Sequence, residues 1–535
     1  MNTCRGVALA VVAVLGAVWA FADDPQMRGL AAGQDVALAG RLDFVWGDPL
    51  PLGSGAPRVR YVLTDDGGAT WLLNVDPERV DAAGGARVFN RQRVVVQGKV
   101  LRDAELEVES LALERETDRD DGTRFRATGS QPYVWILVRF ADDASTPEQP
   151  AWFETQALGP HPSLDDFWRE VSFDNINLLG SQVVGWYTLP HDRSYYVEDI
   201  DPNDPGLELH FNLALDDAAA LADPEVYFPD FVGINLIFNG ELDGWAWGGS
   251  RQRSFDGVTK VYGVTWMPPG GWYDHGILAH EMGHALGLPH SSGPYDAVYD
   301  SRWDVMSASH GTCAQADPVY GCLATHTIAY HKNWLDWIPT ARRHVVGTSP
   351  EVTTVYLYDL AVAPPAGYYH YVRIPAGTDK FYTVEARRLT GYDQNIPGPA
   401  VVLHKVDYAV NDHAYVVDPD GDGDCNDDGA QWQPGETFYD GTAGVLMTVD
   451  RAGANWSQVT FTNVPRSPVY VDLANSGYED GTLADPWNTV REGYGAVLVN
   501  GTVYIKPAAY PETLVLSKPA TLQRQGTTGT VTIGQ

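Results

Sequence analysis

Residues 280–290 read HEMGHALGLPH, and this stretch constrains the fold of the chain more than any other. Flanking apolar residues predict a buried helix through YDHGILAHEMGHALGL, in which His280 and His284 lie one turn apart on one face. Gly287 can adopt a positive φ at little cost, so the helix can end there and the chain can turn back. His290 can then reach the same point as the other two imidazoles.

Three imidazoles that converge on one point predict a zinc site. With one water they complete a tetrahedral set that keeps an open position, which favours Zn²⁺. Glu281 is rotated about 100° from His280 around the helix, so it can lie beside the ion without binding it. The alternative is a buried helix with incidental histidines, but such a set of fixed positions arises by chance on the order of 10⁻⁵ times per chain. We predict zinc ligands at His280, His284 and His290.

The same stretch resembles a known signature, H-E-x-x-H-x-x-G-x-x-H of the metzincin metallopeptidases. FWREVSFDNINLLGSQVVGWYTLP and HTIAYHKNWLDWIP also resemble bacterial secreted peptidases related to gametolysin and immune inhibitor A, over roughly residues 131–450. The resemblance implies an α+β catalytic domain that hydrolyses peptide bonds with a metal-activated water and Glu281 as general base. It also implies a methionine turn beneath the metal, for which Met306 is the candidate. No tyrosine directly follows Met306, which leaves Tyr295 and Tyr299 as possible transition-state-stabilising residues.

The N-terminus predicts export. Arg5 precedes the apolar run VALAVVAVLGAVWA, and the AFA that ends at Ala22 has the small-x-small pattern of a signal-peptide cleavage site. A membrane anchor is the alternative, but about 14 apolar residues are short for a membrane span. We expect cleavage after Ala22 and a secreted protein without a membrane span.

Net charge bears on the partners of the chain, and its cysteines bear on disulfide formation. The formal net charge of −34 repels phosphate backbones, which argues against a nucleic-acid partner. Cys313 and Cys322 flank the turn-rich stretch CAQADPVYGC and predict a disulfide in an oxidising compartment. Cys4 leaves with the signal peptide, and Cys425 has no readable role.

The pattern of helices and strands divides the chain into several parts. Alternating apolar and polar runs predict β-structure on both sides of a middle region in which buried strands and long helices are mixed. We predict a multidomain protein with a signal peptide (1–22), a small OB-like β-barrel with a linker (23–130), an α+β metzincin-like zinc metallopeptidase domain (131–345), a β-sandwich (346–466) and a β-helix-like segment (467–535).

The role of the predicted barrel stays open. Residues 23–130 contain no cysteine, which excludes a thiolate that blocks the zinc ion. A propeptide, a chaperone-like barrel and a binding module all remain compatible with this part of the sequence.

An acidic loop, DPDGDGDCNDD at residues 418–428, predicts a structural calcium site. Asp418, Asp420, Asp422 and Asp424 place carboxylates at every second position, which suits Ca²⁺. The first three match an EF-hand-type loop, but Gly429 stands where the usual bidentate glutamate would be. The alternative is a solvated acidic turn, although no Lys or Arg between residues 411 and 440 balances the charge.

We predict that the chain is a secreted zinc-dependent endopeptidase that acts on proteins or peptides. The alternative is a surface adhesin or glycan-binding protein whose β modules carry the function. The last part of the chain resembles the opening of right-handed parallel β-helix proteins, several of which bind or act on polysaccharide, so extracellular polysaccharide is a further possible partner. Polysaccharide cleavage by this part is opposed by its short length.

Overall fold

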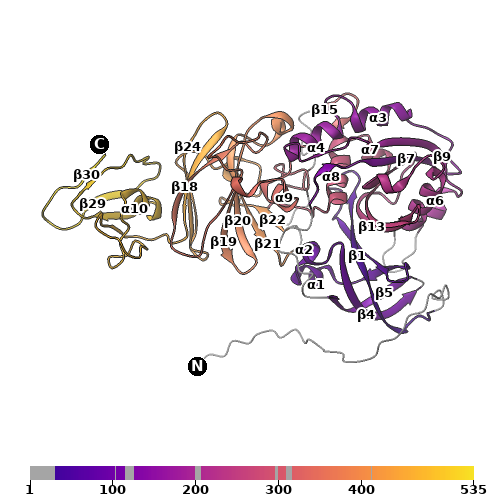
Figure 1. Cartoon of the computed structure of the whole chain (residues 1–535), viewed down its shortest axis with the longest axis horizontal. Coiled ribbons are helices and arrows are strands. Elements are labelled where there is room, and N and C mark those ends of the chain that lie inside the picture. Colours follow the sequence, from indigo (N-terminus) through magenta and orange to yellow (C-terminus); the bar gives the residue numbers. More distant parts are fainter. Residues whose placement is uncertain are drawn as a thin grey trace.

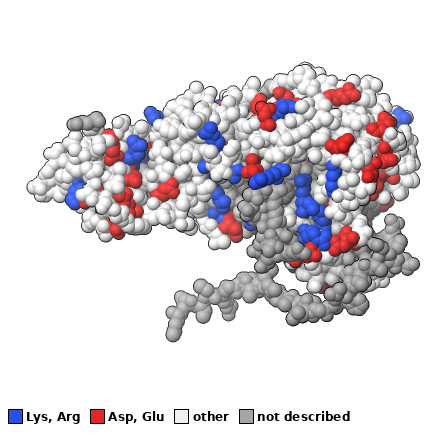
Figure 2. Space-filling model, viewed as in Figure 1, with Lys and Arg blue, Asp and Glu red and all other residues white. Residues whose placement is uncertain are grey.

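The computed structural model describes residues 30–102, 104–114, 126–198, 206–295, 299–308, 316–410 and 413–534. The predicted signal peptide and Cys313 lie outside these residues. The described chain is multidomain and mostly β (Figure 1). None of its helices is long and apolar enough to cross a bilayer. On the face in Figure 2, acidic side chains are spread along the whole length instead of forming one patch.

A small five-stranded barrel begins the described chain, which confirms the predicted N-terminal β-barrel. Strand β1 pairs with both β2 and β4, and this closes the order β2-β3-β5-β4-β1. Val94 and Val96 alternate with more exposed neighbours and join the core inside the barrel. The elements are β1 (Asp35–Pro49), β2 (Arg58–Asp65), β3 (Thr70–Asn74), α1 (Pro77–Ala82), α2 (Gly85–Phe89), β4 (Gln92–Arg102) and β5 (Glu105–Leu113).

The middle part is a mostly parallel sheet with helices on both faces. Its strand order is β13-β14-β12-β7-β9, and β13 is the antiparallel strand at one side. Trp135 and Leu137 of β7 join the core beneath α3, α4 and α8, whereas Val134 and Ile136 join the core beneath α6. This explains why β7 is a continuous apolar run. The strands are β7 (Tyr133–Arg139), β9 (Gln182–Thr188), β12 (Gly233–Phe238), β13 (Trp245–Phe255) and β14 (Val258–Met267), and the helices are α3 (Pro150–Leu158), α4 (Leu164–Ser172), α6 (Phe211–Ala222), α7 (Pro269–Trp272), α8 (His275–Leu286) and α9 (Ala329–Trp334).

Short elements connect these layers. The small pieces are β6 (Gly129–Ser130), β8 (Ile176–Asn177), α5 (Arg193–Tyr196), β10 (Val197–Glu198), β11 (Glu208–Leu209), β15 (Ala316–Asp317) and β16 (Gly321–Cys322).

One continuous sheet joins the barrel to the middle part. The C-terminal end of β1 pairs antiparallel with β13, so both units share a ten-stranded sheet. Figure 1 shows β1 reaching from the barrel to the sheet that underlies α8. The sequence predicted two separate units over residues 23–130 and 131–345, and it did not predict that they share a strand.

Two facing sheets form the next part. Their inner faces share a core that includes Leu357, Val384 and Phe461. The outer face of the first sheet is also buried: Phe381 and Val402 belong to the same core as α8. The first sheet contains β17 (Arg343–Val345), β19 (Tyr371–Gly377), β20 (Lys380–Arg387), β21 (Ala400–Asp407) and β22 (Ala414–Val416), and the second contains β18 (Val352–Tyr358), β23 (Thr437–Asp440), β24 (Val445–Ala452) and β25 (Trp456–Thr462).

The last part contains short parallel strands around its own small core. β26 (Val469–Val471), β27 (Thr502–Ile505) and β29 (Thr521–Arg524) pair in parallel, as do β28 (Ala509–Tyr510) and β30 (Thr532–Ile533). Residues 514–516, LVL, form no strand in this part. The neighbouring Glu512 instead accepts hydrogen bonds from the backbone N–H groups of Val490 (2.8 Å) and Arg491 (2.9 Å) at the start of α10 (Val490–Ala496).

Candidate metal centre

Helix α8 carries the first two predicted zinc ligands. Asp274 caps its N-terminus by accepting a hydrogen bond from the Ile277 N–H at 3.0 Å. Gly287 ends the helix with a φ of +100°, as predicted, and the chain then turns toward His290. Every residue of the helix is buried, so its histidines lie inside the protein and not on a solvated face.

The three predicted ligand atoms converge. The Nε2 atom of His284 lies 3.1 Å from the Nε2 atom of His280 and 3.1 Å from that of His290. Ligand nitrogens of a tetrahedral zinc ion, each about 2.0–2.1 Å from the metal, lie roughly 3.3–3.4 Å apart. The three nitrogens are therefore close enough together to hold one metal ion.

In two of the predicted ligands, a hydrogen bond at the Nδ1 atom determines which ring nitrogen carries the proton. The Nδ1–H group of His280 donates to the carbonyl oxygen of Val305 at 2.6 Å, and that of His284 donates to the carbonyl oxygen of Leu288 at 2.7 Å. Burial lowers the pKa of His284 to about 3, with a contribution from neighbouring His290, so its ring is neutral. The Nε2 lone pairs consequently face each other, which is favourable when a cation lies between them. The residues therefore fit a metal ion.

Met306 lies directly beneath this helix. It is fully buried, and a Cβ atom added to Gly283 would come within 2.3 Å of its sulfur atom. Its carbonyl oxygen accepts a hydrogen bond from the Ser291 N–H at 3.1 Å, just after His290. Met306 thus packs against the helix that carries His280 and His284, and the carbonyl group that accepts from His280 belongs to Val305, the preceding residue.

A buried ionic network holds this turn against the first facing sheet. Arg387 donates to the carbonyl oxygen of Trp303 at 2.7 Å and forms ion pairs with Glu385 (2.9 Å) and Asp393 (2.8 Å). Asp304 accepts from the Met306 N–H at 3.0 Å, and His331 lies 2.9 Å away. The predicted boundary near residue 345 therefore does not separate the site from the sheets that follow.

Glu281 lies beside the histidines with both carboxylate oxygens buried and without a hydrogen-bond partner. Burial, together with the charge of nearby Asp48, holds the pKa of this carboxyl well above its usual range. A buried carboxyl group that makes no hydrogen bond to the protein is costly unless it interacts with something else in the site.

Asp48, near the end of β1, completes the cluster. It is fully buried; its Oδ1 atom lies 2.8 Å from the Nε2 atom of His290, and its Oδ2 atom lies 3.4 Å from those of His280 and His284. Burial opposes ionisation, but His290 and His280 outweigh it and hold the pKa of Asp48 well below its usual range. We did not predict this residue. Its only sequence signal is a carboxylate inside the apolar strand FVWGDPL.

The two tyrosines left open by the sequence lie in different places. The Tyr299 hydroxyl donates to Asp48 Oδ1, and its ring centroid is 5.8 Å from that of His290. The Tyr295 hydroxyl instead donates to Asp418 in the acidic loop. Of these two tyrosines, Tyr299 is therefore the one that lies at the histidine cluster.

The acidic loop brings together three carboxylates, but not the predicted four. Oxygen atoms of Asp418, Asp420 and Asp427 lie within 4.8 Å of one another. Asp422 and Asp424 are not part of this group; Asp424 accepts a hydrogen bond from the Asn426 N–H at 3.0 Å. The prediction of Asp422 and Asp424 as ligands is therefore not supported by the geometry, because the turns of the loop bring Asp427 into the group.

The cysteines are only partly described. Cys322 lies in β16, while Cys313 is outside the described residues, so the disulfide between them stays a prediction. Cys425 is a buried free cysteine whose pKa is raised, chiefly by burial. Its backbone carbonyl accepts a hydrogen bond from Trp303 Nε1 at 3.2 Å, which gives it a place in packing.

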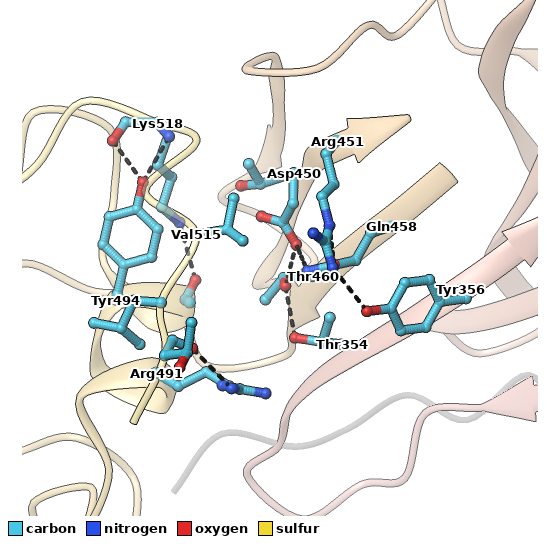
Figure 3. A pocket seen from close by; sticks show the side chains of 14 residues that line it. Thr354, Tyr356, Asp450, Arg451, Gln458, Thr460, Arg491, Tyr494, Val515 and Lys518 are labelled. Atoms are coloured by element: carbon cyan, nitrogen blue, oxygen red, sulfur yellow. Dashed lines mark hydrogen bonds between the residues drawn. The ribbon is translucent and has the colours of Figure 1, made fainter. Parts of the chain in front are cut away.

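A cavity of about 310 Å³ lies between the second facing sheet and the C-terminal part (Figure 3). Its polar groups are used within the protein. Asp450 accepts hydrogen bonds from Ser517 and Thr460, both at 2.7 Å, and Arg451 donates to the Tyr356 hydroxyl at 3.0 Å. The contact from Ser517 joins the two parts, the other two contacts lie within the second sheet, and none of the three favours a ligand.

Comparisons with known proteins assign no family. No family model matches the chain, and no curated protein matches it. The chemistry of the centre therefore rests on its own residues, which are three converging imidazoles, two buried carboxyl groups and one tyrosine.

Proposed function

We propose that the protein is a secreted zinc-dependent endopeptidase of the metzincin type. The observation that carries the proposal is the convergence of three buried Nε2 atoms beside the buried carboxyl group of Glu281. His280, His284 and His290 would hold the zinc ion. Such an ion supplies Lewis acidity toward a water molecule and the scissile carbonyl group.

The residues around the ion supply the proton transfers. Glu281 lies next to the proposed ligands on α8, and its carboxyl group is fully buried. A zinc cation beside it would lower the pKa of this carboxyl group, and in the carboxylate form Glu281 can accept the proton of the attacking water and deliver it to the leaving amine. No covalent bond to the protein is needed in this reaction.

Hydrolysis of casein tests the proposal. The full chain would be assayed before and after limited trypsin treatment, stopped with a serine-protease inhibitor, with and without 1,10-phenanthroline. We expect hydrolysis that phenanthroline abolishes and added zinc restores. The Glu281→Gln variant, treated identically, reports any contaminating protease. Equal hydrolysis by both proteins, or no hydrolysis under any of these conditions, would contradict the proposed function.

Tyr299 is expected to stabilise the oxyanion. Its hydroxyl now donates to Asp48 Oδ1 at the centre, so it can donate to a substrate oxygen at the same place. Tyr299→Phe should lower kcat on a peptide on the order of 10²-fold with little change in zinc content. The matched control is Tyr295→Phe, whose hydroxyl contacts Asp418 instead. Equal kcat values for the two variants would remove Tyr299 from this role.

We also propose that calcium binds Asp418, Asp420 and Asp427 and stabilises the protein. A ligand that binds only the folded state at a hundred times its Kd adds about 2.7 kcal/mol to the free energy of unfolding. Removal of calcium should lower Tm by several degrees, measured by calorimetry, and calcium should restore it. Asp420→Ala with Asp427→Ala should melt low and ignore calcium, whereas Asp424→Ala should still respond. A wild-type Tm that does not depend on calcium argues for a solvated turn.

A further inference from the structure

Strand β1 continues past the barrel and lies along β13. The pairing is antiparallel, with Val45 opposite Gly249 and Asp48 opposite Ala246. Without β1, β13 would be the edge strand of the middle sheet, next to the helix that carries the metal ligands. An exposed edge of this kind pairs readily with an extended peptide. An extended substrate can therefore bind in the place that β1 fills.

The contact between β1 and the centre is closely fitted. The Trp46 ring stacks on His284, with ring centroids 4.8 Å apart and an interplanar angle of 11°. At Gly47, an added Cβ atom would come within 2.4 Å of the Trp247 ring on β13. Arg91 of the barrel donates to the carbonyl oxygen of Ala285 on α8 at 2.5 Å. Contacts made by β1 itself, at Trp46 and Gly47, and by Arg91 from another part of the barrel thus hold the strand in place.

Asp48 points into the metal centre from this strand. Its Oδ2 atom is buried without a hydrogen-bond partner and lies at equal distances, 3.4 Å, from two ligand nitrogens. A carboxylate oxygen in this position can occupy the fourth place of a tetrahedral zinc ion. That place is the one a catalytic water needs.

We propose that the N-terminal barrel is an internal inhibitor, in which β1 covers the substrate-binding edge of β13 and Asp48 is the fourth ligand of the metal. The inference rests on the proposed function, because it concerns regulation of the same centre. Activation requires β1 to leave, which frees the fourth position, the edge of β13 and the Tyr299 hydroxyl together. Of the roles that the sequence left open for residues 23–130, this is the propeptide.

Cobalt provides a readout that does not depend on activity. Co²⁺ in place of zinc has visible absorption that changes with its ligands, and the rate at which a chelator removes it reports access to the centre. We expect Asp48→Ala and the isosteric Asp48→Asn to shift the spectrum of the full chain and to speed removal of Co²⁺ at least tenfold. The matched control is Asp43→Asn: Asp43 is also buried on β1 and accepts from Ser250 on β13 at 3.0 Å, away from the histidines.

The possible results distinguish a failure of the proposed inhibitor from a failure of the proposed peptidase. If Asp43→Asn matches the wild type while both Asp48 variants differ, Asp48 is a ligand. If the wild type and all three variants have the same absorption spectrum and lose Co²⁺ at the same rate, Asp48 is not a ligand, although the proposed peptidase can still stand. If the wild type binds no Co²⁺, the metal centre and the inhibitor fail together.

A cleavable chain tests whether β1 blocks the substrate. A recognition sequence for a site-specific protease, inserted between Asp121 and Gly122, allows the full chain to be cut after folding. We expect peptidase activity to rise at least tenfold once the barrel dissociates, as followed by gel filtration, and to fall again when barrel is added back. Equal peptidase activity before cleavage and after complete separation of the barrel from the rest of the chain would overturn the proposal that β1 blocks the substrate.

Discussion

Glu281→Gln is expected to keep the metal and to lose nearly all peptide hydrolysis. The amide has the shape of the carboxyl group but cannot accept a proton from water, so we expect kcat to fall by about 10²- to 10⁴-fold. Zinc content should stay near one per chain, because Glu281 is not among the converging ligand atoms. Elemental analysis and kcat, measured on the same activated sample, check both halves of this result.

Two other results for the Glu281→Gln variant would contradict this prediction. Wild-type kcat in Glu281→Gln would remove this residue from the role of general base. Loss of zinc in the same variant would instead show that Glu281 supports the structure of the centre.

His284→Ala is expected to remove the metal and the activity together. The Nε2 atom of His284 is the one that lies 3.1 Å from both of the other imidazoles, so it is central to the set. Loss of residues that merely orient a ligand costs about 10- to 100-fold in metal affinity, and loss of a ligand should cost more. Equilibrium titration with zinc measures the change.

A second histidine of the same helix is the control. His275 is also buried on α8, but its Nδ1 atom accepts a hydrogen bond from the Ala324 N–H at 3.2 Å, and it is not in the cluster. His275→Ala should therefore retain zinc at the wild-type affinity when folded. Full zinc binding by His284→Ala, or equal loss in both variants, would contradict the ligand assignment.

The local part of the centre could be predicted because its residues are close in sequence. Helical spacing places His280 and His284 on one face, and the positive φ available to Gly287 brings back His290. Met306 was predictable only through the resemblance, since nothing local shows that it packs against Gly283.

The distant part could not be predicted, because it depends on pairing between strands far apart in the chain. Asp48 reaches the centre only through the register of β1 on β13, and a shift of one residue would turn its side chain to the other face. Similarly, the alternation of aspartates indicated Asp422 and Asp424 as calcium ligands, whereas the path of the loop places Asp427 beside Asp418 and Asp420. Local patterns do not contain this information.

X-ray absorption at the zinc edge, on the full chain loaded with one zinc ion, tests the central claim most directly. The expected shell has three imidazole nitrogens at about 2.0–2.1 Å and one oxygen at about 2.0–2.2 Å. His284→Ala should lose this signature, and Asp48→Ala should exchange a protein oxygen for a water. A spectrum with sulfur ligands, with fewer than three imidazoles, or identical in wild type and His284→Ala would contradict a zinc centre at His280, His284 and His290.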